Sequence, residues 1–268
     1  MCRHFGTPVG QTVFKSGQTL VFMKSGEFWG SNHDHLDAGC FQIYDGAPLL
    51  TDSGVYDSYH TPHRKNYLIQ TAAHNCLTVE PPEGARQSNP GGGQRMPGGG
   101  REPKTPETLF CDEYRAAYTL DHSESDRGCS MTVDLTPAYR HSCQSVVREM
   151  SFDAERRVFR LRDTVTPLAP GALVISHFHV QTEPIIDSEI LTATVENGPG
   201  KAVIRVLSPA DAVISAEGGP GREFVTVPGG ENYPPSGLFH AEAGWGQIEV
   251  CARAKSGETI IEAEIRLL

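Results

Sequence analysis

Short runs that alternate apolar with polar residues, rich in β-branched side chains, recur along this chain and constrain its fold more than any other feature. They include TLVFM at 19–23, CFQIY at 40–44, AVIRVL at 202–207 and IEVCA at 248–252. Turn signals such as Lys-Ser-Gly and Asp-Gly separate them, and the 28 glycines and 19 prolines suit many turns. No long amphipathic helix is evident. The pattern predicts an all-β fold, a large antiparallel β-sandwich.

Charge and cysteine usage narrow the class of protein further. The formal net charge is -10, so the chain gains nothing from the counterion release that drives nucleic-acid binding, and we expect no nucleic-acid partner. The seven cysteines are scattered without a CxxC pair, which argues against a disulfide framework or a zinc ribbon. No apolar stretch approaches the roughly 20 residues of a membrane helix, so we expect no membrane partner.

The N-terminal sequence lacks the apolar core of a signal peptide. We therefore expect either a cytoplasmic protein or the later part of a longer, periplasmic or secreted precursor. The Gly- and Pro-rich stretch at about 81–106 interrupts the strand pattern and lacks the Lys-Ser/Thr pair of a phosphate loop. We expect a surface excursion there, within one sandwich domain that spans residues 1–268.

The residues that carry chemistry are concentrated between Asn32 and Asn75. His33 and His35 would share one face of a strand. Asp52 ends an apolar strand, and His74 stands at the start of another. Two histidines and one aspartate from three strands would make a three-ligand, zinc-type site. The alternative is that each is a separately satisfied polar residue at a strand end.

The stretches SNHDHLDAGCFQIYDGAPLLTDSGVY and HRKNYLIQTAAHNCLTV resemble the heparinase II/III-like family of polysaccharide lyases. The shared pattern is H-x-H-x-D-x-G-x-F, then a strand that ends in D-x-G-x-Y, then A-H-N. The resemblance is strong over about residues 30 to 80. It implies a supersandwich-like β-domain and lyase activity on acidic glycans such as heparan sulfate, other glycosaminoglycans or alginate.

The resemblance also implies roles for matching positions. His33 corresponds to a histidine that faces substrate, and Asn75 would buttress the site. The implied metal ligands are His35, Asp52 and His74, which would hold a mainly structural zinc ion. A tyrosine after the D-x-G-x-Y turn corresponds to a catalytic tyrosine; Tyr56, Tyr59 and Tyr67 compete for this role, and we favour Tyr59.

These residue types suit the β-elimination of a uronic acid. A base removes the C5 proton, an acid reaches O4, and the carboxylate is neutralised as charge develops at C5. We expect Arg64, Asn32 and Trp29 to contact substrate, although Trp29 is equally well explained as core. His177 and His179 also alternate on a strand, where a satisfied interior role is the better interpretation.

The resemblance implies that a helical toroid domain precedes the sandwich, whereas this chain starts with sandwich-like sequence. We therefore expect either a fragment of a lyase or a stand-alone sandwich whose activity requires another chain or is absent. Its expected partners are an acidic polysaccharide, a helical domain and, as a further possibility, a second copy in a homodimer. The alternative functions are a catalytically incomplete, metal-binding carbohydrate-binding or oligomerisation sandwich, and a metal-dependent hydrolase.

Overall fold

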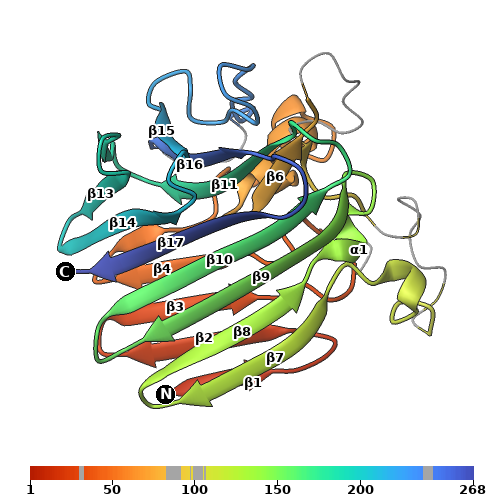
Figure 1. Ribbon diagram of the computed structural model, residues 1–268, viewed down its shortest axis with the longest axis horizontal. Helices are drawn as coiled ribbons and strands as arrows, with labels where there is room; N and C mark the ends of the chain where they lie inside the picture. Colours follow the sequence, from red (N-terminus) through yellow and green to blue (C-terminus); the bar gives the residue numbers. More distant parts are fainter. Residues whose placement is uncertain (30–32, 83–91, 97, 99–104, 106, 238–243) are drawn as a thin grey trace.

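The computed structural model describes residues 1–29, 33–82, 92–96, 98, 105, 107–237 and 244–268. The strands in this part of the chain form three sheets, and every pair of neighbouring strands is antiparallel (Figure 1). The five-stranded sheet contains, in order, β1 (Cys2–Phe5), β2 (Gln11–Ser16), β3 (Thr19–Lys24), β4 (Phe41–Asp45) and β5 (Pro48–Leu50). This architecture confirms the predicted all-β sandwich.

The other two sheets are built mostly from the second half of the chain. The eight-stranded sheet has the order β12 (Ile185–Asp187), β13 (Thr192–Asn197), β14 (Gly200–Ser208), β17 (Thr259–Leu267), β10 (Val158–Pro167), β9 (Cys143–Asp153), β8 (Gly128–Asp134) and β7 (Tyr118–Ser125). The four-stranded sheet has the order β15 (Val213–Gly218), β16 (Gly246–Arg253), β11 (Leu173–Val180) and β6 (Leu77–Glu80). The described helical segments are short: η1 (Arg64–Leu68), η2 (Thr71–Ala73), η5 (Asp112–Tyr114) and α1 (Thr136–Tyr139).

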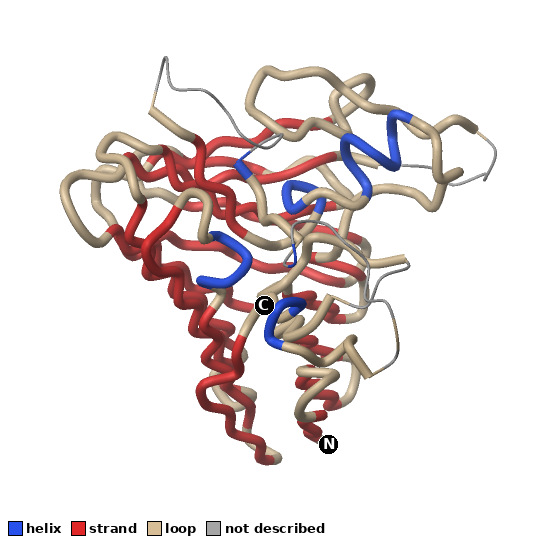
Figure 2. The backbone as a smooth tube through the Cα atoms, turned by 90° about the vertical axis from the view of Figure 1, so that its right-hand side faces the viewer, coloured by secondary structure: helices blue, strands red, loops and turns tan. Residues whose placement is uncertain are grey.

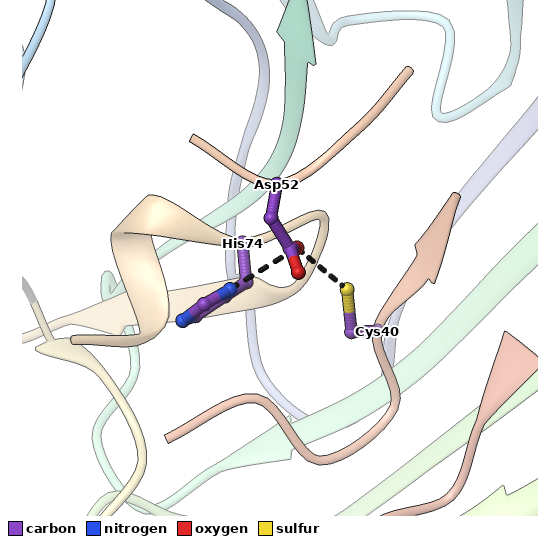
Figure 3. Close-up of side chains that lie close together, drawn as sticks. All are labelled: Cys40, Asp52 and His74. Atoms are coloured by element: carbon purple, nitrogen blue, oxygen red, sulfur yellow. Dashed lines mark hydrogen bonds and ion pairs between the residues drawn. The ribbon is translucent and has the colours of Figure 1, made fainter. Parts of the chain in front are cut away.

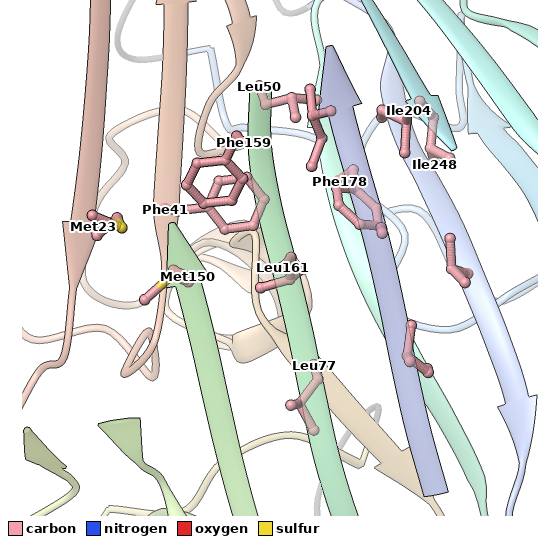
Figure 4. Close-up of a cluster of buried hydrophobic side chains, with 14 of the residues drawn as sticks. Met23, Phe41, Leu50, Leu77, Met150, Phe159, Leu161, Phe178, Ile204 and Ile248 are labelled. Atoms are coloured by element: carbon pink, nitrogen blue, oxygen red, sulfur yellow. The ribbon is translucent and has the colours of Figure 1, made fainter. Parts of the chain in front are cut away.

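The core lies between the five-stranded and eight-stranded sheets, which Figure 2 shows as two layers, and it continues onto the strands of the four-stranded sheet. Alternate residues of each strand point inward, as the burial pattern of β3 illustrates. The Phe41 ring, from one sheet, stacks on the Phe159 ring of the other at a centroid distance of 4.8 Å (Figure 4). Phe14 and Phe152 make a second contact between the sheets at 5.2 Å. The alternation that predicted the strands is therefore the pattern that fills the sandwich.

A buried ion pair between two strands of the eight-stranded sheet also contacts the loops that contain Gly39 and Asn75. Arg148 on β9 lies opposite Asp163 on β10, and both side chains are fully buried. The guanidinium donates to both carboxylate oxygens, at 2.6 and 2.8 Å. Its remaining nitrogen donates to the backbone carbonyls of Gly39 and Asn75, each at 2.8 Å. This one side chain thus ties two strands of the large sheet to two separate loops.

The Gly- and Pro-rich segment differs in part from the expected surface excursion. Residues 92–94 are buried, and the Gln94 amide both accepts from Ala38 N at 3.0 Å and donates to Ala38 O at 2.7 Å. A polar amide that satisfies a loop backbone in this way is a packing element. Most of the rest of 81–106 lies outside the described residues.

The four-stranded sheet carries a buried polar layer that includes Glu249 on β16. This carboxylate accepts from the Gln247 amide at 3.0 Å and lies 3.8 Å from His177 Nδ1. Burial and, to a smaller extent, the nearby carboxylates of Glu217 and Glu80 together raise the pKa of Glu249 to about 7. The folded protein therefore favours the neutral acid.

We expect Glu249→Gln to stabilise the protein at pH 8 and to leave it nearly unchanged at pH 4. Because the pKa of Glu249 is higher in the folded than in the unfolded protein, its contribution to the free energy of unfolding is fully present below the unfolded-state pKa. That contribution is lost as pH rises toward the folded-state pKa of about 7. Removing the ionisable group should then add about 1–3 kcal/mol to the free energy of unfolding at pH 8. Urea denaturation of both proteins at the two pH values measures this, and an equal difference at pH 4 and pH 8 would contradict it.

Candidate functional site

The segment that carries the first two histidines is a loop, not the expected strand. His33 adopts a positive φ of 63°, and Gly39 follows at 79°, so side chains do not alternate here as in a strand. The loop is held by its neighbours: Leu36 N donates to Ile69 O at 2.9 Å, and Asp37 pairs with Lys24 at 2.7 Å. The strand prediction for residues 33–37 was wrong because the glycine turn into β4 and these tertiary contacts override the local pattern.

Three predicted metal ligands nevertheless lie in a row. His35 Nδ1 is 3.2 Å from His74 Nε2, and His74 Nδ1 is 3.1 Å from Asp52 Oδ1. Burial alone would lower the pKa of His74, but the Asp52 carboxylate outweighs it and raises the pKa to about 9. Burial and the neighbouring His74 lower the pKa of His35 to about 4. With these pKa values, His74 is a protonated imidazolium that lies between the Asp52 carboxylate and the neutral imidazole of His35.

Cys40 is a member of this cluster that the sequence reasoning missed. Its thiol lies 3.1 Å from Asp52 Oδ1, and Figure 3 shows Cys40 and His74 both directed at the Asp52 carboxylate. One donor atom from each of Cys40, Asp52 and His74 lies within 4.8 Å of the others. The other Asp52 oxygen accepts from the Gln42 amide at 2.8 Å. The adjacency of Cys40 to the Gly39 turn in the H-x-H-x-D-x-G motif was the available signal.

The chain positions this cluster with buried backbone contacts. Asn75, next to His74, donates to Phe41 O at 2.8 Å and accepts from His179 N at 2.7 Å. It therefore joins the start of β4 to β11, as the expected buttress would. Arg148 donates hydrogen bonds to the backbone carbonyl groups of Gly39 and Asn75. These hydrogen bonds fix the backbone on either side of the cluster.

A second group of predicted residues meets at the surface. The Tyr59 hydroxyl lies 2.7 Å from His33 Nε2, and the Arg64 guanidinium carbon lies 4.2 Å from the centre of the Tyr59 ring. Tyr59 is 40% exposed, and His33 is exposed as well. The Tyr59 loop is anchored by Asp57, which accepts from Ser236 N at 2.9 Å. A phenol, an imidazole and a cation thus share an accessible surface.

The other tyrosines differ in their surroundings. Tyr67 is buried and donates to Ser53 Oγ at 2.8 Å, which suits packing. Burial raises the pKa of its hydroxyl, which disfavours ionisation there. Tyr56 is 56% exposed. Tyr59, in contrast, contacts both His33 and Arg64.

Several other polar and aromatic residues in or near these segments have less access to a substrate. Trp29 is 7% exposed and packs near Tyr114, which favours the core alternative over a sugar platform. His63 is buried against Tyr233 O at 2.5 Å, so it is unsuited to contact substrate. His177 and His179 are buried on β11 and make hydrogen bonds, as expected of interior histidines. Asn32 lies outside the described residues.

A cavity of about 410 Å³ opens beside the cluster. Its described lining includes Asp52, Ser53, His179, Gln181 and Phe224. The Asp52 side chain is 33% exposed, whereas that of His74 is buried. The cavity is therefore a solvent path to the carboxylate end of the cluster.

The fold and these two side-chain groups define a large β-sandwich with a candidate metal cluster and an exposed His–Tyr–Arg group. The family model "Heparinase II/III-like, C-terminal" matches residues 2–264. The chain belongs to this family and corresponds to its C-terminal domain. No curated protein matches the sequence.

Solved structures agree on the fold. A heparinase III structure superposes with a TM-score of 0.68 at 17% identity, and covers 100% of this chain and 36% of its own. Heparan sulfate lyase HepC from Pedobacter heparinus superposes with a TM-score of 0.69 at 15% identity, with the same coverage. The chain thus spans about a third of the length of these lyases. Among the described residues, no helix is long and apolar enough to cross a membrane.

Proposed function

We propose that this chain is the sandwich portion of a polysaccharide lyase that cleaves uronic-acid-containing polysaccharide by β-elimination. The observation that carries the proposal is the exposed contact between Tyr59 and His33, with the Arg64 guanidinium over the tyrosine ring. Family membership and the fold of heparan sulfate lyases support it. Formation of unsaturated uronate, followed by its ultraviolet absorbance, tests it.

The residues divide the chemistry in a physically reasonable way. The Tyr59 hydroxyl and the His33 imidazole lie within hydrogen-bond reach at 2.7 Å, so the two groups would share the base and acid steps at C5 and O4. Arg64 would neutralise the substrate carboxylate while negative charge spreads into it. The remaining groups around the sugar would come from a helical domain opposite this surface.

The proposal includes a structural metal ion at His74 and Asp52, with His35 beside them. The fit rests on the donor types: a buried imidazole nitrogen and a carboxylate oxygen converge at 3.1 Å, with a thiol next to them. Such a mixed nitrogen, oxygen and sulfur set suits zinc. A bound divalent ion would replace the proton on His74 and tie the ends of β4, β5 and β6 together.

Removing this ion should lower the melting temperature. Free zinc at about 1,000 times its dissociation constant contributes about 4 kcal/mol to stability. Each kcal/mol shifts the melting temperature of a domain of this size by roughly 2–4 °C, so a chelator should lower it by roughly 8–16 °C. Differential scanning calorimetry with zinc, with chelator and after zinc is restored measures the effect. An unchanged melting temperature would contradict a structural ion, and loss of turnover alone would favour a metal-dependent hydrolase.

The second candidate function is a carbohydrate-binding or oligomerisation sandwich that retains the metal without turnover. The coverage of only 36% of each lyase favours it for the chain on its own. It predicts binding of heparan sulfate or alginate oligosaccharides with no unsaturated product, even when a helical domain is supplied. As part of an exported lyase, the chain would act in the periplasm or outside the cell.

A further inference from the structure

We infer that Cys40 is a thiolate ligand of the metal ion, and that the site therefore selects a thiophilic ion such as zinc over magnesium or calcium. This inference rests on the metal site proposed above. It goes further by naming a ligand outside the His35, Asp52 and His74 set and the class of ion that follows from it. Soft thiolate ligands select zinc and cobalt, whereas magnesium and calcium prefer oxygen ligands.

The arrangement of donor atoms supports Cys40 directly. Its sulfur and the Nδ1 atom of His74 both lie 3.1 Å from the same oxygen of Asp52, and Figure 3 shows the three side chains converging from separate segments. All three donor atoms lie within 4.8 Å of one another. Ligand atoms around a tetrahedral zinc ion, with bonds of about 2.0–2.3 Å, are about 3.5 Å apart. Small side-chain movements would therefore close the set around an ion.

His74 Nδ1 gives a second reason. This buried nitrogen approaches the Asp52 oxygen at 3.1 Å, but it is misaligned for a full hydrogen bond. A buried polar atom without an aligned partner is uncommon, and a metal ion bound at this nitrogen would satisfy it. The Cys40 thiol approaches the same Asp52 oxygen at 3.1 Å, so an ion bound among the three atoms would replace both contacts.

In this arrangement His35 is a neighbour of the bound histidine and is not itself a ligand. It contacts His74 at Nε2, whereas Asp52 and Cys40 lie at the Nδ1 side of the same ring. The two ring nitrogens point in different directions, so an ion among Cys40, Asp52 and His74 leaves His35 as a partner of the second nitrogen. Metal-bound histidines commonly have their other nitrogen fixed by such a neighbour. His35 would be a positioning residue.

Charge and access agree with this assignment. A thiolate and a carboxylate would together balance a divalent ion, and binding would release the thiol proton and the imidazole proton to solvent. Cys40 and His74 are buried, while Asp52 is partly open to the 410 Å³ cavity. The cavity supplies an entry path and room for a water molecule as a fourth ligand.

Titration of the metal-free chain with Co²⁺ tests the inference. A cysteine thiolate bound to cobalt gives a charge-transfer band in the near ultraviolet, which nitrogen and oxygen ligands do not give. We expect this band in the wild-type chain at one equivalent, its loss in Cys40→Ser, and a loss of Co²⁺ affinity of at least about 100-fold. Cys76→Ser is the matched control, because Cys76 is buried and its thiol contacts that of Cys40. It should keep the band, as should His35→Ala.

The outcomes separate this inference from the metal site itself. Tight Co²⁺ binding without the band, or a band that survives in Cys40→Ser, overturns the role of Cys40 and leaves the metal site standing. Failure of the folded wild-type chain to bind Co²⁺ or Zn²⁺ overturns both. Circular dichroism checks the fold of each variant, and Cys40→Ala replaces Cys40→Ser if the serine variant does not fold.

Discussion

Replacing Arg148 with alanine is expected to lower the free energy of unfolding by about 3–5 kcal/mol, one of the largest effects in this protein. The substitution leaves the Asp163 carboxylate buried without its cation, and loss of one partner of a buried pair has a cost of this size. It also removes donors from the carbonyl groups of Gly39 and Asn75. Urea denaturation followed by circular dichroism measures the change.

Arg162→Ala is the matched control for this prediction. Arg162 lies on β10 and reaches Glu149 at 3.4 Å and Glu262 at 3.6 Å, but its side chain is 43% exposed. Solvent screens such pairs, so the variant should lose no more than about 1 kcal/mol. Equal destabilisation by the two substitutions would show that the buried pair does not hold the loops as described.

The second large effect is expected from Tyr59→Phe. Lyase turnover, assayed in the presence of a helical domain, should fall by roughly 10²–10⁴-fold because the substitution removes the hydroxyl that we propose as an acid–base group beside His33. The ring under Arg64 remains, so KM should change little. Initial rates of unsaturated uronate formation from heparan sulfate give both constants.

Tyr56→Phe provides the control, since Tyr56 is exposed on the same loop. It should retain wild-type turnover within about twofold, as expected of a solvated surface group. If Tyr56→Phe is as damaging as Tyr59→Phe, or if Tyr59→Phe is fully active, the assignment of the catalytic tyrosine is wrong.

Much of the sandwich was predictable because its strands carry strong local signals. The expected runs at 19–23, 202–207 and 248–252 lie within β3, β14 and β16. In each run, alternate apolar residues point into the same core, and short turns fix the register of the hairpins. The loop at 33–40 was not predictable from alternation. The positive φ of His33 and the tertiary contacts of the loop set the directions of its histidine side chains, and a strand period does not.

The buried support of the site was also invisible in the sequence. Arg148 and Asp163 have the strand positions of ordinary charged residues, and nothing local distinguishes a buried pair from an exposed one. Cys40 was missed for a related reason: a lone cysteine at a strand start is usually a small buried residue. The role of Cys40 as a candidate ligand depends on Asp52 and His74, and the fold brings these two residues beside it.

The central proposal is that this sandwich contributes His33 and Tyr59 to a lyase whose opposite wall is a helical domain. β-Elimination requires the base, the acid and the carboxylate clamp within reach of one sugar ring, so the chain alone should cleave uronans very poorly.

The most direct test follows unsaturated uronate while the chain is incubated with heparan sulfate, alginate and hyaluronan, alone and with a helical domain encoded in the same gene. We expect little product from the chain alone, clear product when the helical domain is added, and loss of that product in His33→Ala. Absence of unsaturated product from all three polysaccharides with both domains present, or robust turnover that His33→Ala leaves intact, would contradict the account.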